Sequence, residues 1–115
     1  MRKKAFLNLY ESFFDKAGWK NTIGGYLNSD YCKKTSRTDG YAVFAKIDAE
    51  NKMIELVFDK YSGLQADCLL SKLFLHKDLP KKEKIFIDLF NSEANLMFKK
   101  GQVTIKQNEL NEDFQ

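Results

Sequence analysis

The sequence predicts an α+β fold, a small single domain in which an antiparallel β-sheet is covered on one face by an N-terminal helix and a second helix. Two patterns carry this prediction. Apolar residues recur at helical intervals near the N-terminus, and further along they alternate with polar residues in two adjacent arms, as they do in strands. The length of 115 residues fits one domain, and ten phenylalanines supply large surfaces for its core.

The first element is an amphipathic helix predicted over residues 5–17. Its apolar side chains recur every three or four residues and therefore share one face, which we expect to pack on the core. Gly18 follows as a stop of the C-cap type, and Trp19 can fold back on the last turn. The apolar positions are Phe6, Leu7, Leu9, Tyr10, Phe13, Phe14 and Ala17.

A short strand is predicted next from Ile23, Tyr26 and Leu27, with Gly24 and Gly25 as a bend or bulge. The glycine pair lacks the further glycines, the lysine and the hydroxyl of a phosphate-binding loop. We therefore interpret it as part of the fold and predict no nucleotide site there.

A central hairpin is the clearest strand signal, with arms at about 41–48 and 53–59 joined by a four-residue connection. Both arms alternate and are rich in β-branched and aromatic residues. In the second arm, the apolar side chains would share one face, and Glu55 and Asp59 would lie on the other. We expect one covered face and one wetter face.

A second helix is predicted over residues 64–77, where leucines, Cys68 and His76 fall at helical spacing. It should end before Pro80, because the residue that precedes a proline resists helical dihedrals. Residues 81–101 fit two structures, a helix that begins at Pro80 and stops at Gly101, or a pair of strands. Residues 107–115 are polar, and we expect a frayed tail.

The composition excludes several functions. Nineteen basic residues against 16 acidic ones leave a charge of +3, too small an excess for a dedicated DNA-binding domain. Cys32 and Cys68 have no metal or redox spacing, and a single histidine builds neither a metal cluster nor a catalytic triad. No stretch reaches the roughly 20 apolar residues of a membrane span. We expect a cytoplasmic protein with reduced thiols and no cofactor, metal or membrane association.

Two surfaces are candidate partner-binding sites. The first is a basic, aromatic loop over residues 31–41, in which tyrosines and cations suit protein hot spots and also nucleic-acid backbones and bases. The second is the charged sheet face with Glu55 and Asp59. The loop can also be a plain connection into the hairpin. The candidate residues of the first surface are Tyr26, Tyr31, Lys33, Lys34, Arg37 and Tyr41.

The leading hypothesis is a non-enzymatic protein-binding module, most concretely an immunity or inhibitor protein that blocks or escorts one protein partner. The layout resembles that of small bacterial secretion chaperones and of many immunity proteins, a likeness of fold that carries no function by itself. The alternative is a nucleic-acid-binding protein that uses loop 31–41. An enzyme based on carboxylates and tyrosines is the third hypothesis.

Overall fold

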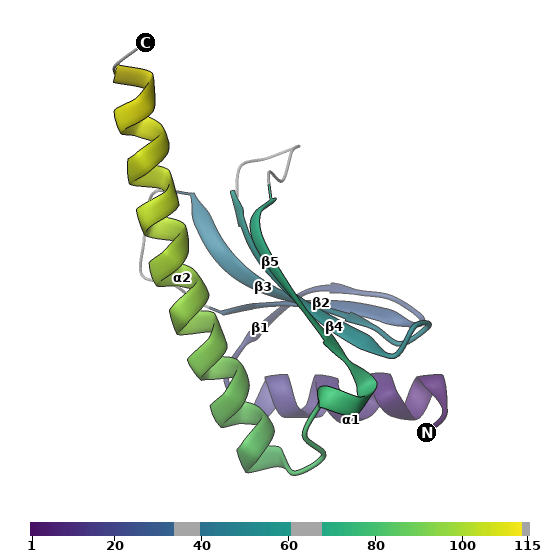
Figure 1. Ribbon diagram of the computed structural model, residues 1–115. Coiled ribbons are helices and arrows are strands. Elements are labelled where there is room, and N and C mark those ends of the chain that lie inside the picture. Colours follow the sequence, from purple (N-terminus) through teal and green to yellow (C-terminus); the bar gives the residue numbers. More distant parts are fainter. Residues whose placement is uncertain (34–39, 61–67, 114–115) are drawn as a thin grey trace.

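The computed structural model describes residues 1–33, 40–60 and 68–113, and it confirms the predicted α+β fold (Figure 1). Five strands form one antiparallel sheet in the order β1-β2-β3-β4-β5, so each strand pairs with its neighbours in the sequence. The elements are α1 (Lys3–Lys16), β1 (Lys20–Gly24), β2 (Asn28–Lys33), β3 (Tyr41–Asp48), β4 (Met53–Lys60), β5 (Cys68–Leu75), a 3-10 turn (His76–Asp78) and α2 (Glu83–Asp113).

Helix α1 confirms the first predicted element. Its inward face buries five side chains, and it ends where Gly18 adopts a left-handed φ of 82°, which glycine tolerates without strain. The reversed chain brings the backbone N–H of Trp19 to the carbonyl of Phe14, at 3.1 Å. The indole of Trp19 then packs on the Phe14 ring, with ring centroids 4.9 Å apart. The stop signal read from the sequence is therefore a C-cap that also adds to the core.

The central hairpin is confirmed as β3 and β4, paired from Tyr41 opposite Lys60 to Asp48 opposite Met53. Its turn is held by Asp48, whose carboxylate accepts hydrogen bonds from the Asn51 backbone N–H at 3.1 Å and from its side-chain amide at 2.9 Å. The alternation along both strands places six aliphatic and aromatic side chains on one face, almost completely buried. They are Val43, Ala45, Ile47, Ile54, Leu56 and Phe58.

The helix predicted over residues 64–77 is wrong, because residues 68–75 form strand β5 and 76–78 a 3-10 turn; residues 64–67 lie outside the described ranges. Antiparallel pairing with β4 sets Phe74 opposite Ile54 and Leu73 opposite Glu55. A run of leucines satisfies the helical and the extended period equally well. The pairing with β4, which local sequence does not reveal, decides between them.

Residues 81–101 adopt the helical alternative, and α2 continues beyond the expected stop at Gly101 to Asp113. The last turns of α2 therefore include residues 107–113, which the sequence predicted as a frayed tail. Gly101 does not end the helix, because it lies in its interior against the ring of Phe58, where a methyl group would overlap the ring. A close helix–sheet contact, and not a C-cap, accounts for this glycine.

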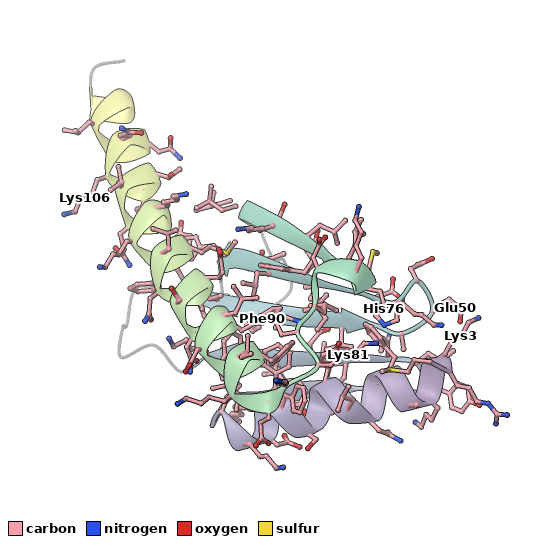
Figure 2. All side chains as sticks on the ribbon, turned by 60° about the horizontal axis from the view of Figure 1, so that its bottom comes forward. Lys3, Glu50, His76, Lys81, Phe90 and Lys106 are labelled. Atoms are coloured by element: carbon pink, nitrogen blue, oxygen red, sulfur yellow. The ribbon has the colours of Figure 1, made fainter. Side chains whose placement is uncertain are left out.

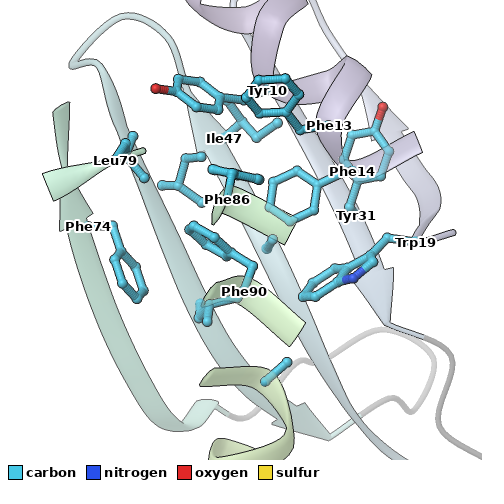
Figure 3. Packing of buried hydrophobic residues seen from close by; sticks show 14 of the residues in the cluster. Tyr10, Phe13, Phe14, Trp19, Tyr31, Ile47, Phe74, Leu79, Phe86 and Phe90 are labelled. Carbon is cyan, nitrogen blue, oxygen red and sulfur yellow. The ribbon is translucent and has the colours of Figure 1, made fainter. Parts of the chain in front are cut away.

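An aromatic cluster fills the space between the two helices and the sheet (Figure 3). Phe86 and Phe90 of α2 stack with centroids 4.4 Å apart, and Phe14 of α1 meets them at 5.2 and 5.3 Å. Phe74 of β5 lies 4.8 Å from Phe90. Replacing one such buried ring by alanine typically costs about 3–5 kcal/mol. Because both helices pack here, the core lies on one side of the sheet.

Candidate functional site

No described helix covers the opposite side of the sheet, which we call the open face. Alternation places its side chains one position away from the buried ones, and the strand register sets them in rows across the sheet. On β2 to β5 the open face comprises Asn28, Asp30, Cys32, Ala42, Phe44, Lys46, Asp48, Met53, Glu55, Val57, Asp59, Cys68, Ser71, Leu73 and Leu75.

A charged row crosses the centre of the open face. Asp30 of β2, Lys46 of β3 and Glu55 of β4 are paired in register, so the basic residue has an acidic residue on each side. Burial raises the pKa of Asp30; Lys46 opposes that rise, and the charge of Asp59 adds to it. With two acidic residues and one basic residue, the row has an excess of negative charge for a partner to meet.

Asp59 lies near one end of the open face and is only 5% exposed. Its Oδ1 has no hydrogen-bond partner among the described residues. Cys68 is its cross-strand neighbour, and the pKa of that thiol is raised by burial first and then by the charge of Asp59. The arrangement keeps Cys68 protonated, which makes it a poor nucleophile.

The other end of the open face continues into a shallow hollow of ≈ 570 Å³. Three carboxylates line it, those of Asp30, Asp48 and Glu50, together with Lys46. Glu50 is paired with Lys3 at 2.6 Å, and Figure 2 shows the two side chains together at the N-terminal end of α1. The hollow is open and charged, and it suits a protruding polar side chain of a partner better than an apolar ligand.

Apolar side chains flank the charged row. Leu73 and Leu75 of β5 are 49% and 42% exposed, and Phe44 is half-buried at the centre. Val57 lies between Phe44 and Ser71 in its row and is buried. The open face thus has charged and apolar areas side by side, the mixture typical of protein interfaces.

Sequence reasoning identified only part of this face. Alternation in the hairpin placed Glu55 and Asp59 on the side opposite the apolar residues, as the register shows, but Asp59 is buried there. Asp30 and Leu73 were missed because their membership follows from the pairing of β2 with β3 and of β5 with β4. The alternation of Leu73 with Phe74 was the one available signal, and the helical interpretation of that segment concealed it.

Loop 31–41 does not form one aromatic surface in the described residues. Tyr31 is a buried residue of β2 stacked on Phe14, at 5.3 Å between ring centroids. Tyr41 begins β3 and stacks on Phe58 at 5.4 Å. Both tyrosines therefore face the core, and a partner meets neither ring in full. Two further predicted residues of this surface, Lys34 and Arg37, lie outside the described ranges.

Lys33 also faces the helices and not the open face. Its ammonium donates to Asn95 Oδ1 at 2.6 Å and to the carbonyl of Asn91 at 3.4 Å, both in α2. Burial lowers the pKa of Lys33. This lysine therefore ties the end of β2 to α2.

Of the predicted site residues within the described ranges, Tyr26 has the most accessible side chain, 80% exposed. It lines the hollow, and the Lys4 ammonium stands 5.3 Å from the centre of its ring and donates to its carbonyl at 3.2 Å. An exposed aromatic ring at the rim of a charged hollow is a suitable contact for a protein partner. The structure therefore brings Tyr26 together with the open face and separates it from Tyr31 and Tyr41.

The histidine and the two cysteines were weighed as candidates for chemistry in the sequence. The described residues contain no group of three or more His, Cys, Asp or Glu side chains placed to hold a metal ion. Burial raises the pKa of Cys32, as it does for Cys68. His76 packs edge-on against Phe6 at 5.5 Å, and its pKa is lowered by burial and by the nearby charges of Lys81 and Lys52. Among the described helices, none is long and apolar enough to cross a membrane.

Comparison with known proteins adds no relative: no family model, no curated protein and no solved structure matches this chain.

Proposed function

We propose that this chain is a non-enzymatic protein-binding module that meets its partner with the open face, most concretely as an inhibitor or escort of the immunity type. One observation carries the proposal: both helices pack on the same side of a five-stranded sheet, and no described helix covers the other side. That side exposes leucines beside charged residues, and exposed apolar side chains rimmed by polar ones mark interaction surfaces.

The charge of the open face indicates the chemistry of the partner. On β2 to β5 four carboxylates stand against the single ammonium of Lys46, with Lys20 of β1 at the rim opposite Cys32. This excess is negative although the chain as a whole has a charge of +3. A partner with a basic contact surface would be steered to this face and away from the positively charged remainder. The carboxylates are Asp30, Asp48, Glu55 and Asp59.

The same charge disfavours nucleic acid at the open face, because phosphates are repelled by carboxylates. Of the loop cations named for nucleic acid, Lys33 lies within the described residues, and it bonds to α2 instead of facing the open face. We therefore carry protein binding forward as the proposed function.

Binding of this kind acts by occlusion. The aromatic core packs against the reverse side of the sheet and fixes the strands. The backbone that carries the open-face side chains is therefore in place before a partner binds. Phe44, Leu73 and Leu75 would supply the apolar contact, and the charged row would set the register of the two proteins. A basic active or binding surface on the partner would be covered directly.

Site-specific photo-crosslinking in the native cell tests the proposal. Benzoylphenylalanine at position 44 preserves an aromatic ring at the centre of the open face, and the same probe at Ile85 of α2, 54% exposed, serves as the control. The expected result is a covalent adduct with one other protein from position 44 and none from position 85. Adducts only with the chain itself, or equal adducts from both positions, would overturn the proposal.

A further inference from the structure

The two edges of the sheet differ in how they are protected. Strand β1 has five residues, all exposed, and a bulge between Asn21 and Ile23 interrupts its pairing with β2. Gly24 and Gly25 follow at once. Short length, irregular pairing and polar side chains are the devices by which natural sheets avoid adding another strand.

Strand β5, at the other edge, lacks most of these devices. It has eight residues, four of them leucine, and it pairs only with β4 among the described strands. Its one irregularity is confined to the end beside Asp59 and Cys68, so Leu70 to Leu75 remain regular. Lys72 does not guard the edge, because it turns to the helix side and bonds to Glu93 of α2 at 3.0 Å. Within the described ranges, no strand pairs with the outer side of β5.

A groove of ≈ 220 Å³ lies between the middle of β5 and α2. Leu70 and Lys72 line it from the strand, and Glu93, Leu96 and Lys100 from the helix. Glu93 and Lys100 are seven residues apart and so lie on similar sides of α2, with Leu96 midway and about half exposed. One flank of α2 thus carries an acid, an apolar side chain and a base in that order.

We propose that β5 pairs antiparallel with β5 of a second copy of this chain, which joins the two sheets into one of ten strands. A two-fold axis perpendicular to the sheet keeps the helices of both copies on the same side and reverses α2. The reversal sets Glu93 of each copy opposite Lys100 of the other, across the joined grooves. A parallel arrangement would need a two-fold axis along the strands, which would put the α2 helices of the two copies on opposite sides of the joined sheet.

The side chains of β5 restrict the register. In such a pair a residue at the axis faces its own copy, and Lys72 at that position would set two ammoniums directly opposite, which is destabilising. Ser71 or Leu73 at the axis avoids this contact, and both lie on the open face. The dimer would leave the charged row of the open face accessible, whereas Leu73 and Leu75 would lie beside the side chains of the second copy.

Sedimentation equilibrium of the full chain tests the proposal. We expect a concentration-dependent dimer whose dissociation constant rises at least tenfold for Lys100→Glu. Recovery is expected in the triple variant Lys72→Glu, Glu93→Lys and Lys100→Glu, which also keeps opposite charges at positions 72 and 93 of each copy. Lys106→Glu makes the same charge change on α2 outside the groove, and it should leave the dimer intact. A wild-type monomer at all concentrations would overturn the proposal and would leave this edge to an extended segment of another protein. A dimer indifferent to Lys100→Glu, or not recovered by the triple variant, would also overturn it.

A cysteine scan tests the strand pairing separately. In a background of Cys32→Ser and Cys68→Ser, mild oxidation should link copies that carry a cysteine at the axis, either Ser71→Cys or Leu73→Cys. The other position should stay unlinked, because its two cysteines would lie about 13 Å apart along the paired strands. Thr22→Cys on the exposed β1 edge is the matched control and should stay unlinked. Efficient linkage at position 22, or no linkage at 71 and 73 in variants whose circular dichroism matches the wild type, would refute pairing through β5.

Discussion

Gly101 of α2 rests directly on the ring of Phe58 in β4, with no room for a methyl group between them. The ring itself is fixed, since it is fully buried, stacked on Tyr41 at 5.4 Å and met edge-on by Phe98 at 5.9 Å. This contact sets how closely the long helix approaches the sheet. It explains a glycine in the middle of a helix, where glycine is otherwise unfavourable.

Replacement of Gly101 by alanine should therefore destabilise the protein. Helix propensity alone predicts a gain of about 1 kcal/mol, whereas overpacking against Phe58 costs about 1–3 kcal/mol and should outweigh it. Urea denaturation measures the balance, with the exposed Lys99→Ala on the same helix as control. A Gly101→Ala variant as stable as the wild type would contradict the account of this contact.

The Trp19 indole N–H donates to Asn91 Oδ1 at 2.9 Å, which ties the segment after α1 to α2. Asn91→Leu removes that acceptor from a buried indole and should cost about 1–3 kcal/mol in the free energy of unfolding. The chain has one tryptophan, so its fluorescence reports this site alone. Ser92→Leu, at the exposed neighbouring position, should leave the stability and the emission unchanged. Equal effects of the two substitutions would argue against the hydrogen bond.

His76 should titrate below the ordinary histidine pKa of 6.5, because burial, Lys81 and Lys52 disfavour its charged form. Figure 2 shows His76 and Lys81 on the same part of the molecule. NMR titration of this single histidine measures the pKa directly, and Lys81→Ala should raise it. Lys106→Ala, far along α2, should leave it unchanged.

The lowered pKa of His76 also determines how its contribution to stability changes with pH. Between the lowered folded pKa and the unfolded value the unfolded chain binds more protons, so the His76 contribution to stability rises with pH. It is complete above about pH 6.5 and is lost as the pH falls through the folded pKa. A folded pKa at or above 6.5 would contradict this environment for His76.

Cys68 should become more reactive when the charge of Asp59 is removed. Burial is the larger cause of its raised thiol pKa and the Asp59 carboxylate the next, so Asp59→Asn should lower that pKa and increase the thiolate fraction. Alkylation by iodoacetamide at pH 8, in a Cys32→Ser background, measures the rate. Asp48→Asn, at the far end of the open face, is the control. An unchanged or slower rate for Asp59→Asn would show that its carboxylate does not act on the thiol.

Strong local periodicity explains which elements the sequence predicted. Helix α1 and the β3–β4 hairpin each carry an unambiguous period and a clear terminal signal, such as Gly18. The prediction for the residues of β5 was wrong because their leucines fit both the helical and the extended period. Only the pairing with β4 distinguishes the two structures. In the helical alternative for residues 81–101, Gly101 was predicted as the stop. The contact that requires this glycine is with Phe58, 43 positions away in the sequence, so local sequence does not reveal it.

The candidate site divides in the same way. Alternation within one strand placed Glu55 and Asp59 on the open face. Register between strands is needed to see that Asp30, Lys46 and Glu55 form one row. The mixture of tyrosines and cations in residues 31–41 predicted a shared surface, yet Tyr31 and Lys33 alternate in β2 toward the core and the helices. The composition of that segment did not reveal which way its side chains point. The strand geometry of β2 determines that direction.

Contact between a partner and the open face can be tested by measuring the affinity of the crosslinked partner for charge-reversed variants. Glu55→Lys reverses one charge of the central row, and Asp88→Lys makes the same change at an exposed position of α2. With purified proteins at low salt, we predict that Glu55→Lys weakens binding at least about tenfold, or ~1.4 kcal/mol, while Asp88→Lys leaves it within about twofold of the wild type. Weakening by Asp88→Lys that equals or exceeds that of Glu55→Lys would contradict the account.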